Sequence, residues 1–380
     1  MKYQWKLVFA ALALAACEDT DISAPEQEAS FAATAVDNAP GVVYTLTNQP
    51  SGNAIAIFDR ASDGVLAYAG EVQTGGLGTG GGLGSQGAIV ASENHRWLLA
   101  VNAASNDVSV FEVRGSRPVF VQRIASGGQL PVSVAIRNNL VYVLNAGGTG
   151  NIAGLTLGSD GRLTPLDAAS QPLSAANAGA AQVSFTPDGG ALVVTERFTN
   201  AIDVYTLNRD GTVNPAQVFP SHGETPFGFD FDKRGRLIVS EAFGGATDGS
   251  AASSYFVRSD RSLSLVTGSL LTTETAACWL VVSKDGSHAY TANNGSNSIT
   301  GYSIGRDGSL SLLDVDGVTA STADGAGALD LALSTNGRFL YVLGGGNETI
   351  TGFLRNNDGS LEPVTVSSGL ADKAVGLVAF

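Results

Sequence analysis

The sequence predicts an all-β fold, a seven-bladed β-propeller with four-stranded antiparallel blades, over residues 41–380. Three observations predict it. Turn dipeptides return about every 50 residues, short β-branched and aromatic runs lie between them, and the chain ends in a strand-like run that no hairpin follows. No long stretch has the apolar spacing of an amphipathic helix.

The turns set the period. Asp-Gly and related pairs favour hairpin turns because these residues tolerate positive φ. One set of turns comprises Asp63-Gly64, Asp160-Gly161, Asp210-Gly211, Asp260-Arg261, Asp307-Gly308 and Asp358-Gly359. A second set comprises Asn94, Asn139, Gly189, Gly235, Gly286 and Gly337. Each period then holds four strands, and both sets of turns lie on one face of the ring, which we call the hairpin face; the opposite face is the loop face.

The repeats divide residues 41–380 into seven units. We place the starts of the units near Gly41, Gly87, Pro131, Ala180, Pro226, Ala277 and Ala328. The first unit begins at its second strand, 42–47, and residues 374–380 form an inner strand without a hairpin. The C-terminus is therefore expected to complete the N-terminal blade and close the ring. Rings of six or eight blades and a sandwich array are the alternatives.

The N-terminal residues have the pattern of an export signal. Lys2 and Lys6 precede an apolar run at 7–16 that is too short to span a bilayer, and small residues then lead to Cys17. This pattern predicts a lipoprotein signal peptide at 1–16 with lipidation of Cys17; an ordinary secretory signal is the alternative. Residues 17–40 follow as a flexible acidic tether with no Lys or Arg. We expect a protein anchored by lipid in the cell envelope, facing the periplasm, with the outer membrane preferred.

Composition excludes several classes of partner and site. The net charge of −14 argues against sequence-independent binding of nucleic acid, which requires a basic surface. Two cysteines exclude a disulfide scaffold, and Cys278 lies in a strand-like run where a small buried thiol is expected. We expect a monomer. The glycine-rich run 74–84 contains a G-x-G-x-x-G match, but without a following helix it is interpreted as a tight loop.

Polar residues recur where each second strand ends. At seven equivalent points the sequence has Asn48, Asn102, Asn145, Glu196, Glu241, Asn293 and Gly344. In one interpretation these side chains cap the N–H groups of the following loops. In the other they surround a pocket on the loop face, where Glu196 and Glu241 would act as acids and a calcium ion could bind, although no resident metal is predicted. His222, in a loop on the same face, could serve as a general base.

The blade motifs resemble those of the seven-bladed propeller lactonase family, which includes phosphogluconolactonase and carboxymuconate-lactonising enzymes. The resemblance covers roughly 41–380. It rests on 185–189 (FTPDG), on 281–286 (VVSKDG) with 289–293 (AYTAN), and on 333–337 (LSTNG) with 339–342 (FLYV). It implies a propeller that hydrolyses a lactone, with the reacting groups on the loop face.

The family pattern maps onto named positions. Its Arg-His pair opens the first strand of certain blades, and a Glu ends the next strand. Here the pair positions hold Ala181-Gln182 and Cys278-Trp279, and Glu196 is retained with Arg197 beside it. The resemblance implies Glu196 as general base and Arg197 as the group that polarises the carbonyl, with His222 or Glu241 as an auxiliary group. Substrate contacts are expected from Asn102, Asn145, Gln182, Asn293 and Trp279.

Two hypotheses remain open. One is an envelope lactone or ester hydrolase whose substrate is a small molecule, in a metal-free or a calcium-dependent form. The other is a non-catalytic binding or scaffolding propeller that recognises a glycan, a peptide or an envelope protein through its loop face. Fold alone does not decide between them.

Overall fold

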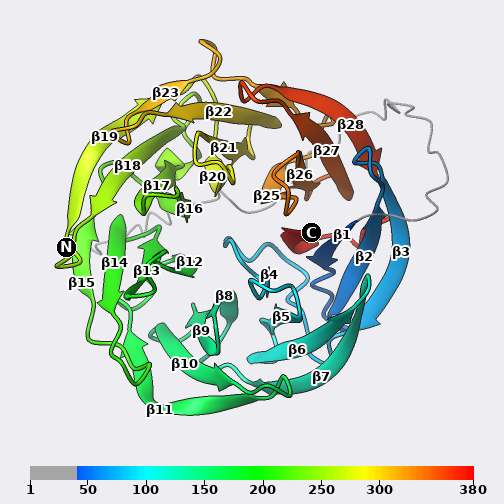
Figure 1. Cartoon of the computed structure of the whole chain (residues 1–380), viewed down its shortest axis with the longest axis vertical. Coiled ribbons are helices and arrows are strands. Elements are labelled where there is room, and N and C mark those ends of the chain that lie inside the picture. Colours follow the sequence, from blue (N-terminus) through cyan, green and yellow to red (C-terminus); the bar gives the residue numbers. More distant parts are fainter. Residues whose placement is uncertain (1–40) are drawn as a thin grey trace, which may run out of the picture.

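The computed structural model describes residues 41–380, so the signal peptide, Cys17 and the tether lie outside the described residues. Seven β-sheets stand around a central axis like the blades of a propeller (Figure 1). This arrangement confirms the predicted fold class and the number of blades. In every blade the strands are antiparallel and run outward from the axis in sequence order, except in blade 1, whose innermost strand comes from the C-terminus.

The first four blades contain the following strands, from the axis outward. Blade 1 has β29 (Val375–Ala379), β1 (Gly41–Leu46), β2 (Ala54–Arg60) and β3 (Leu66–Gln73); blade 2 has β4 (Ile89–Ala91), β5 (Trp97–Asn102), β6 (Asp107–Arg114) and β7 (Arg117–Ala125); blade 3 has β8 (Pro131–Arg137), β9 (Leu140–Asn145), β10 (Asn151–Leu157) and β11 (Leu163–Pro172); blade 4 has β12 (Ala180–Phe185), β13 (Ala191–Glu196), β14 (Ala201–Thr206) and β15 (Gln217–Pro220).

The remaining blades follow the same order. Blade 5 has β16 (Pro226–Phe231), β17 (Arg236–Glu241), β18 (Ala251–Val257) and β19 (Leu263–Leu271); blade 6 has β20 (Ala277–Val282), β21 (His288–Asn293), β22 (Ser298–Ile304), β23 (Leu310–Leu312) and the short β24 (Ala320–Ser321), which also pairs with β22; blade 7 has β25 (Ala328–Leu333), β26 (Phe339–Gly344), β27 (Thr349–Arg355) and β28 (Leu361–Ser367).

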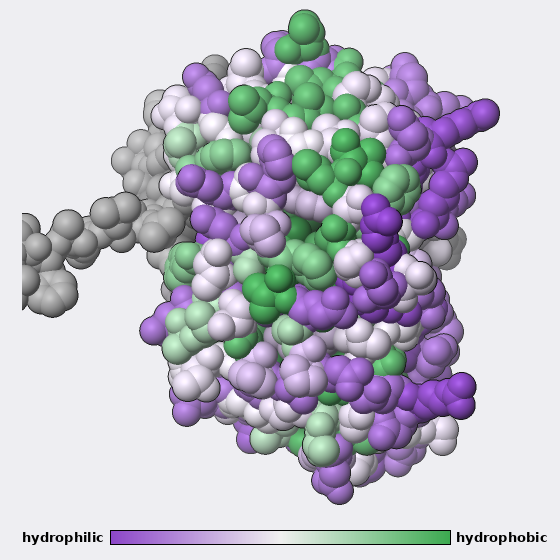
Figure 2. Space-filling model, turned by 90° about the vertical axis from the view of Figure 1, so that its left-hand side faces the viewer, coloured by the Kyte–Doolittle hydropathy of each residue, from purple (hydrophilic) through white to green (hydrophobic). Residues whose placement is uncertain are grey.

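Burial explains why these segments form strands in this order. The second strands are almost completely buried, because both of their faces pack against neighbouring blades; all six residues of β5 and of β17 are buried. The outermost strands alternate between buried and exposed residues, as β3 does, because one face meets solvent. On the outer wall of blades 4 and 5, Val218, Phe256 and Leu265 are about half exposed, and Figure 2 shows apolar and polar side chains mixed over this wall.

The C-terminal strand closes the ring as expected. β29 pairs with β1 along Val43–Leu46, and the backbone oxygen of Phe380 accepts hydrogen bonds from Nε and Nη2 of Arg60 at 3.1 and 2.9 Å. The edge of blade 1 that would otherwise be open is therefore paired.

Two local features differ from the expectation. The second strand of blade 1 ends at Leu46, two residues before Asn48, and the inner strand of blade 2 begins at Ile89 rather than Gly87. Gly87 instead belongs to a segment that crosses the axis. The only helical element in 41–380 is the three-residue 3-10 turn Phe243–Gly245, so none of the described helices could cross a membrane.

Candidate functional site on the loop face

The residues that end the second strands lie inside the blades. The side chains of Asn102, Asn145, Glu196, Glu241 and Asn293 have 0% relative exposure. Their sequence positions at the strand ends are as predicted for these five, but burial of this degree corrects the expectation of a polar ring around an open pocket.

These buried side chains hold the connections between blades. The Thr74 hydroxyl, in the segment that enters blade 2, donates to Oδ1 of Asn102 at 2.6 Å. Nδ2 of Asn145 donates to the carbonyl oxygen of Ser126, in the segment that enters blade 3, at 3.3 Å. These contacts fit the loop-capping interpretation, in which each polar side chain forms a hydrogen bond with a group of a connecting loop that has no partner in the sheet.

Glu196 is the most heavily engaged of these residues. Its Oε1 accepts the backbone N–H of Ser174 at 2.9 Å, and its Oε2 accepts the hydroxyl groups of Ser174 and of Thr199, the latter at 2.6 Å. Asp203, on the adjacent strand β14, is a second buried carboxyl group beside it. Burial, and then the negative charge of Glu196, raise the pKa of Asp203 to about 8. Glu196 is thus held inside the blade and does not face a pocket, contrary to our expectation.

Arg197 follows Glu196 and is partly exposed on the loop face. Its Nε donates to the carbonyl oxygen of Gly179 at 3.2 Å, and its guanidinium lies over the rings of Phe198 and Phe227 at 5.1 and 5.3 Å. A Cβ on Gly84 would lie 2.6 Å from the guanidinium, so Arg197 packs against the glycine-rich loop. Arg197 therefore packs close to the axis, whereas Glu196 lies buried within the blade.

The two family pair positions also support the interior. Gln182 is 8% exposed, and its amide exchanges two hydrogen bonds with the backbone of Phe229, at 2.8 and 3.0 Å. Trp279 is 4% exposed, and its Nε1 donates to the carbonyl oxygen of Ser85 at 2.9 Å. Neither side chain points into an open pocket on the loop face; Gln182 lines a cavity among the inner strands of blades 2, 3 and 4.

The segment Gly82–Gly87, which we call the central plug, fills the loop-face end of the axis. The Ser85 hydroxyl donates to the carbonyl oxygen of Val132 in blade 3 at 2.8 Å, and the Gln86 backbone N–H donates to that of Ala181 in blade 4 at 3.0 Å. The Gln86 amide exchanges hydrogen bonds with the backbone of Leu280 in blade 6 at 2.7 and 2.9 Å. The plug thus joins inner strands from three blades.

Under the plug remains a cavity of about 10 Å³, enough for about one water molecule. The buried carboxyl group of Asp330 lines it, and Oδ2 of this residue has no hydrogen-bond partner among residues 41–380. Burial raises the pKa of Asp330 to about 8, so its carboxyl group is largely protonated at neutral pH. The place where the sequence led us to expect an open pocket is therefore closed.

A second cluster lies at the loop-face end of blade 5 and brings two predicted residues together. The Ser269 hydroxyl donates to Oε2 of Glu241 at 2.7 Å, and its Oγ lies 2.9 Å from Nδ1 of His222. Oε1 of Glu241 accepts the backbone N–H of Gly223 at 2.9 Å. Glu241 is buried, Ser269 is partly buried and His222 is exposed, so the chain of hydrogen bonds runs from the interior to solvent. We call Glu241, Ser269 and His222 the blade 5 cluster.

Backbone features make room for this cluster. A Cβ on Gly223 would lie 2.2 Å from Oε2 of Glu241, and a Cβ on Gly268 would lie 2.6 Å from the ring of His222. Ser269 itself has φ of 32°, which a residue other than glycine seldom adopts. Strained backbone of this kind is concentrated at functional sites.

The cluster has the parts that an ester hydrolase needs. A serine hydroxyl is a nucleophile when a neighbouring base can take its proton, and here both a carboxylate and an imidazole are within hydrogen-bond distance. His222 and Glu241 were predicted as auxiliary groups, but Ser269 was not predicted. Ser269 lies in an ordinary outer-strand sequence, and only Gly268 before it hinted at a special backbone.

The described residues give limited support for a metal site. Residues 41–380 contain no group of three or more His, Cys, Asp or Glu side chains arranged to hold an ion. The carboxylates of Glu196 and Glu241, which we considered as calcium ligands, lie in different blades and accept hydrogen bonds from their own loops. Cys278 is buried, as expected.

Comparison with known proteins places the chain in a family. The family model described as lactonase, 7-bladed beta-propeller, matches residues 148–243 and 255–374, more than half of the chain. No curated protein sequence matches significantly.

Solved structures share the fold at low sequence identity. A Bacteroides uniformis protein proposed to be a 6-phosphogluconolactonase is 18% identical with a TM-score of 0.69, over 90% of this chain and 100% of that one. The periplasmic gluconolactonase of Pseudomonas aeruginosa is 16% identical with a TM-score of 0.70, over 88% and 98%. A Lactobacillus plantarum protein is 17% identical with a TM-score of 0.72, over 90% and 99%. With the match to the family model and the seven closed blades, the chain belongs to the seven-bladed β-propeller lactonase family.

Proposed function

We propose that this protein hydrolyses small carboxylic esters, with lactones as the natural class, at the blade 5 cluster. The observation that carries the proposal is the hydrogen-bonded series Glu241–Ser269–His222, with distances of 2.7 and 2.9 Å. Membership of the lactonase family supports the choice of a cyclic ester as substrate.

In the proposed reaction Ser269 Oγ attacks the carbonyl carbon of the ester while its proton passes to His222 or Glu241. The C–O bond of the ester then breaks, and the leaving oxygen takes up that proton. Water attacks the acyl-serine in the same way, which releases the hydroxy acid and restores Ser269. The exposed position of His222 allows it to exchange protons with solvent.

This proposal places the reacting groups in blade 5, whereas the sequence led us to expect the general base in blade 4. Glu196 would need a free oxygen toward water to act as general base, but its oxygens are buried and accept hydrogen bonds from Ser174 and Thr199. Arg197 remains a group on the loop face that could orient an acidic substrate.

We further propose that the protein is exported and anchored through a lipid on Cys17, facing the periplasm. The short apolar run and the small residues before Cys17 support this assignment. Lipidation occupies the sulfur of Cys17 and therefore excludes a disulfide between the two cysteines of the sequence, so the two states differ in mass. The anchor and the acidic tether would hold the ring near the membrane.

Labelling with a fluorophosphonate probe, which reacts with activated serines, tests the catalytic proposal together with hydrolysis of a panel of lactones and aryl esters. Ser269→Ala should abolish labelling and turnover, and His222→Gln should lower turnover by about 10²–10⁴-fold, the usual share of a general base. Ser264→Ala is the matched control, because Ser264 lies on the same strand and its hydroxyl bonds, within 41–380, to Arg258 alone. If the folded protein is not labelled and turns over no ester, the non-catalytic binding propeller is the better description.

A further inference from the structure

We propose that the propeller has a second binding site, an axial cavity that opens on the hairpin face and takes a small organic anion. This site lies on the face opposite the blade 5 cluster, and it does not depend on the proposed hydrolysis.

The cavity is about 300 Å³, at the lower end of the range for ligand sites. It lies among the inner strands of blades 2, 3 and 4, from Gly87 of the central plug down to Glu93 in a turn and Arg137 at the end of β8. Its lining combines polar groups with apolar side chains, such as the partly exposed Val90 and Ile136. The Ser184 hydroxyl, also in the lining, has no hydrogen-bond partner among the described residues.

Two acidic residues in the turns of the hairpin face are already paired with arginines from outer hairpins. Arg261 pairs with Asp188 at 2.8 Å, and Arg355 pairs with Asp285. Burial opposes the ionisation of Asp188, but hydrogen bonds from Thr186 and Gly190 and the pairing with Arg261 outweigh it and lower the pKa of Asp188 to about 2. These carboxylates therefore do not compete for a further cation on this face.

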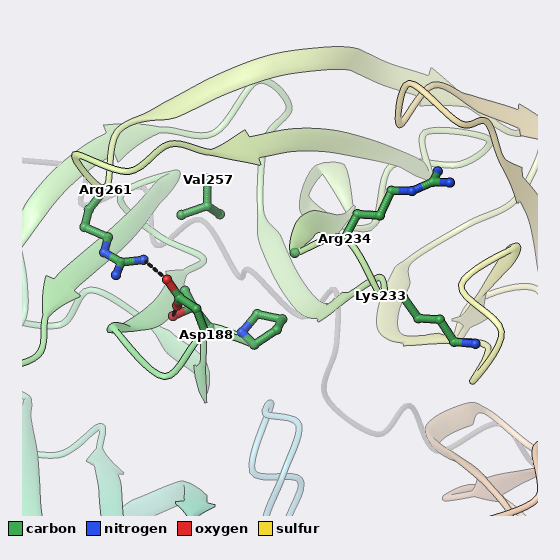
Figure 3. A pocket seen from close by; sticks show the side chains of 8 residues that line it. Asp188, Lys233, Arg234, Val257 and Arg261 are labelled. Atoms are coloured by element: carbon green, nitrogen blue, oxygen red, sulfur yellow. Dashed lines mark hydrogen bonds and ion pairs between the residues drawn. The ribbon is translucent and has the colours of Figure 1, made fainter.

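Among residues 41–380, lysines of the same turns have no such partner. In Figure 3 Arg261 turns toward Asp188, while Lys233 extends away from this pair. The stem of Lys233 lies against Gly286 of blade 6, and the stem of Lys284 lies against Gly337 of blade 7. Neither lysine forms an ion pair within the described part of the chain.

Lys284 acts on groups around the axis. Burial lowers the pKa of His95, in a turn of blade 2 across the ring, and the charge of Lys284 lowers it further. Burial raises the pKa of Asp230, on the inner strand of blade 5, and the charge of Lys284 opposes that rise. Asp230 accepts two backbone N–H groups, from Phe231 and Val282, at 2.7 and 2.9 Å. Lys284 thus supplies positive charge to the axial region of the hairpin face.

Arg137 supplies a second cation at the mouth. Its Nη2 donates to the carbonyl oxygen of Pro187 at 2.6 Å, which fixes its direction, and its contact with Glu93 is a loose one at 3.8 Å with Glu93 70% exposed. A carboxylate group could displace Glu93 and pair with Arg137, and the charge of Lys284 would attract it to the mouth. An apolar body would then fill the cavity, and a hydroxyl on it could pair with Ser184.

Isothermal titration calorimetry at low ionic strength tests this site with three probes: hexanoate, benzoate and inorganic phosphate. We expect saturable binding of at least one organic carboxylate. Arg137→Gln should weaken it about tenfold, which corresponds to about 1.4 kcal/mol. Lys284→Gln should weaken it at low ionic strength and have little effect in high salt, which screens attraction at a distance. Arg209→Gln is the matched control, an exposed arginine of an outer turn on the same face.

Three outcomes would overturn the proposal: no saturable binding of any probe, equal loss in the Arg209 control, or phosphate binding as tightly as both organic anions, since the cavity would then contribute nothing. The same titration with Ser269→Ala should give unchanged affinity. This arm separates failure of the axial site from failure of the proposed hydrolysis.

Discussion

The carboxyl groups of Glu196 and Asp203 lie on the adjacent strands β13 and β14 inside blade 4, and both are fully buried. Burial and the negative charge of Glu196 raise the pKa of Asp203, because two negative charges in the interior would repel each other strongly. The pair therefore links the stability of blade 4 to pH.

The first prediction concerns this linkage. The pKa of Asp203 is about 8 in the folded protein and near the ordinary value of 3.8 in the unfolded chain. Between these values the folded state binds the extra proton, so this contribution to stability is complete at acidic pH and is lost as pH rises toward 8. Asp203→Asn should flatten this fall in the free energy of unfolding, measured by urea denaturation at several pH values. Asp330→Asn, at another buried acid whose pKa burial raises to about 8, should remove a separate part of this pH dependence; an unchanged slope in both variants would contradict the assignment.

Glu196→Gln should change stability and leave turnover intact. The amide would direct two N–H donors at a site where Ser174 and Thr199 already donate. We expect a loss of about 1–3 kcal/mol, as for other buried groups left without partners. Thermal unfolding and ester hydrolysis should be measured on the same sample. A large loss of turnover at unchanged stability would return the general base to blade 4.

Gly223→Ala should abolish turnover without unfolding the ring, because the added Cβ would lie 2.2 Å from Oε2 of Glu241 and force the carboxylate away from Ser269. Gly81→Ala is the control, since no atom lies within 4 Å of its Cβ position. Kinetics and circular dichroism of the two variants distinguish a local effect from a global one.

Trp279→Phe should weaken the central plug. The change keeps an aromatic ring but removes the Nε1 donor, so the carbonyl oxygen of Ser85 is left without its bond at 2.9 Å. A loss of about 1–3 kcal/mol in the free energy of unfolding is expected. Hydrogen exchange of the backbone amides at 82–87 should accelerate at the same time; if their protection is unchanged, the plug does not depend on Trp279.

Mass spectrometry of the mature N-terminus tests the proposed anchor. A terminus at Cys17 that carries acyl chains is expected. Detection of residues 1–16 in the mature protein, or an unmodified terminus elsewhere, would replace the lipoprotein assignment with ordinary secretion or with none. A peptide in which Cys17 is cross-linked to Cys278 would also overturn it, because the lipid and the disulfide require the same sulfur.

The sequence predicted the fold well because the turns that define a propeller blade depend on local residue preferences. Turns such as Asp160-Gly161 and Gly189 need positive φ, and they recur with the period of the blade. The inner-strand starts at Pro131, Ala180 and Ala277 are those of the structure. Strand ends are also local, so Glu196 and Glu241 were correctly placed along the chain.

The site was harder to predict because it depends on contacts between distant residues. A side chain at the end of a strand can face either a pocket or a neighbouring loop. For Glu196 the answer depends on Ser174, whose segment covers the carboxylate and donates its backbone N–H to it. The plug depends on contacts of Ser85 and Gln86 with blade 6, across 194 residues of sequence. The positive φ of Ser269 could not be predicted from the sequence, because serine is not a residue type that favours such a backbone conformation.

The pairing of β29 with β1 also dictates when this protein can become complete. Thr45 donates to the carbonyl oxygen of Val375, which lies 330 residues later in the chain. A polypeptide that emerges from a ribosome or a translocation channel N-terminus first must therefore keep the free edge of β1 unpaired until residues 375–379 are released. Contacts so far apart in sequence form slowly. During that interval the edge is open to strands of other chains, so chaperone protection of the nascent chain is needed most shortly before β29 is released.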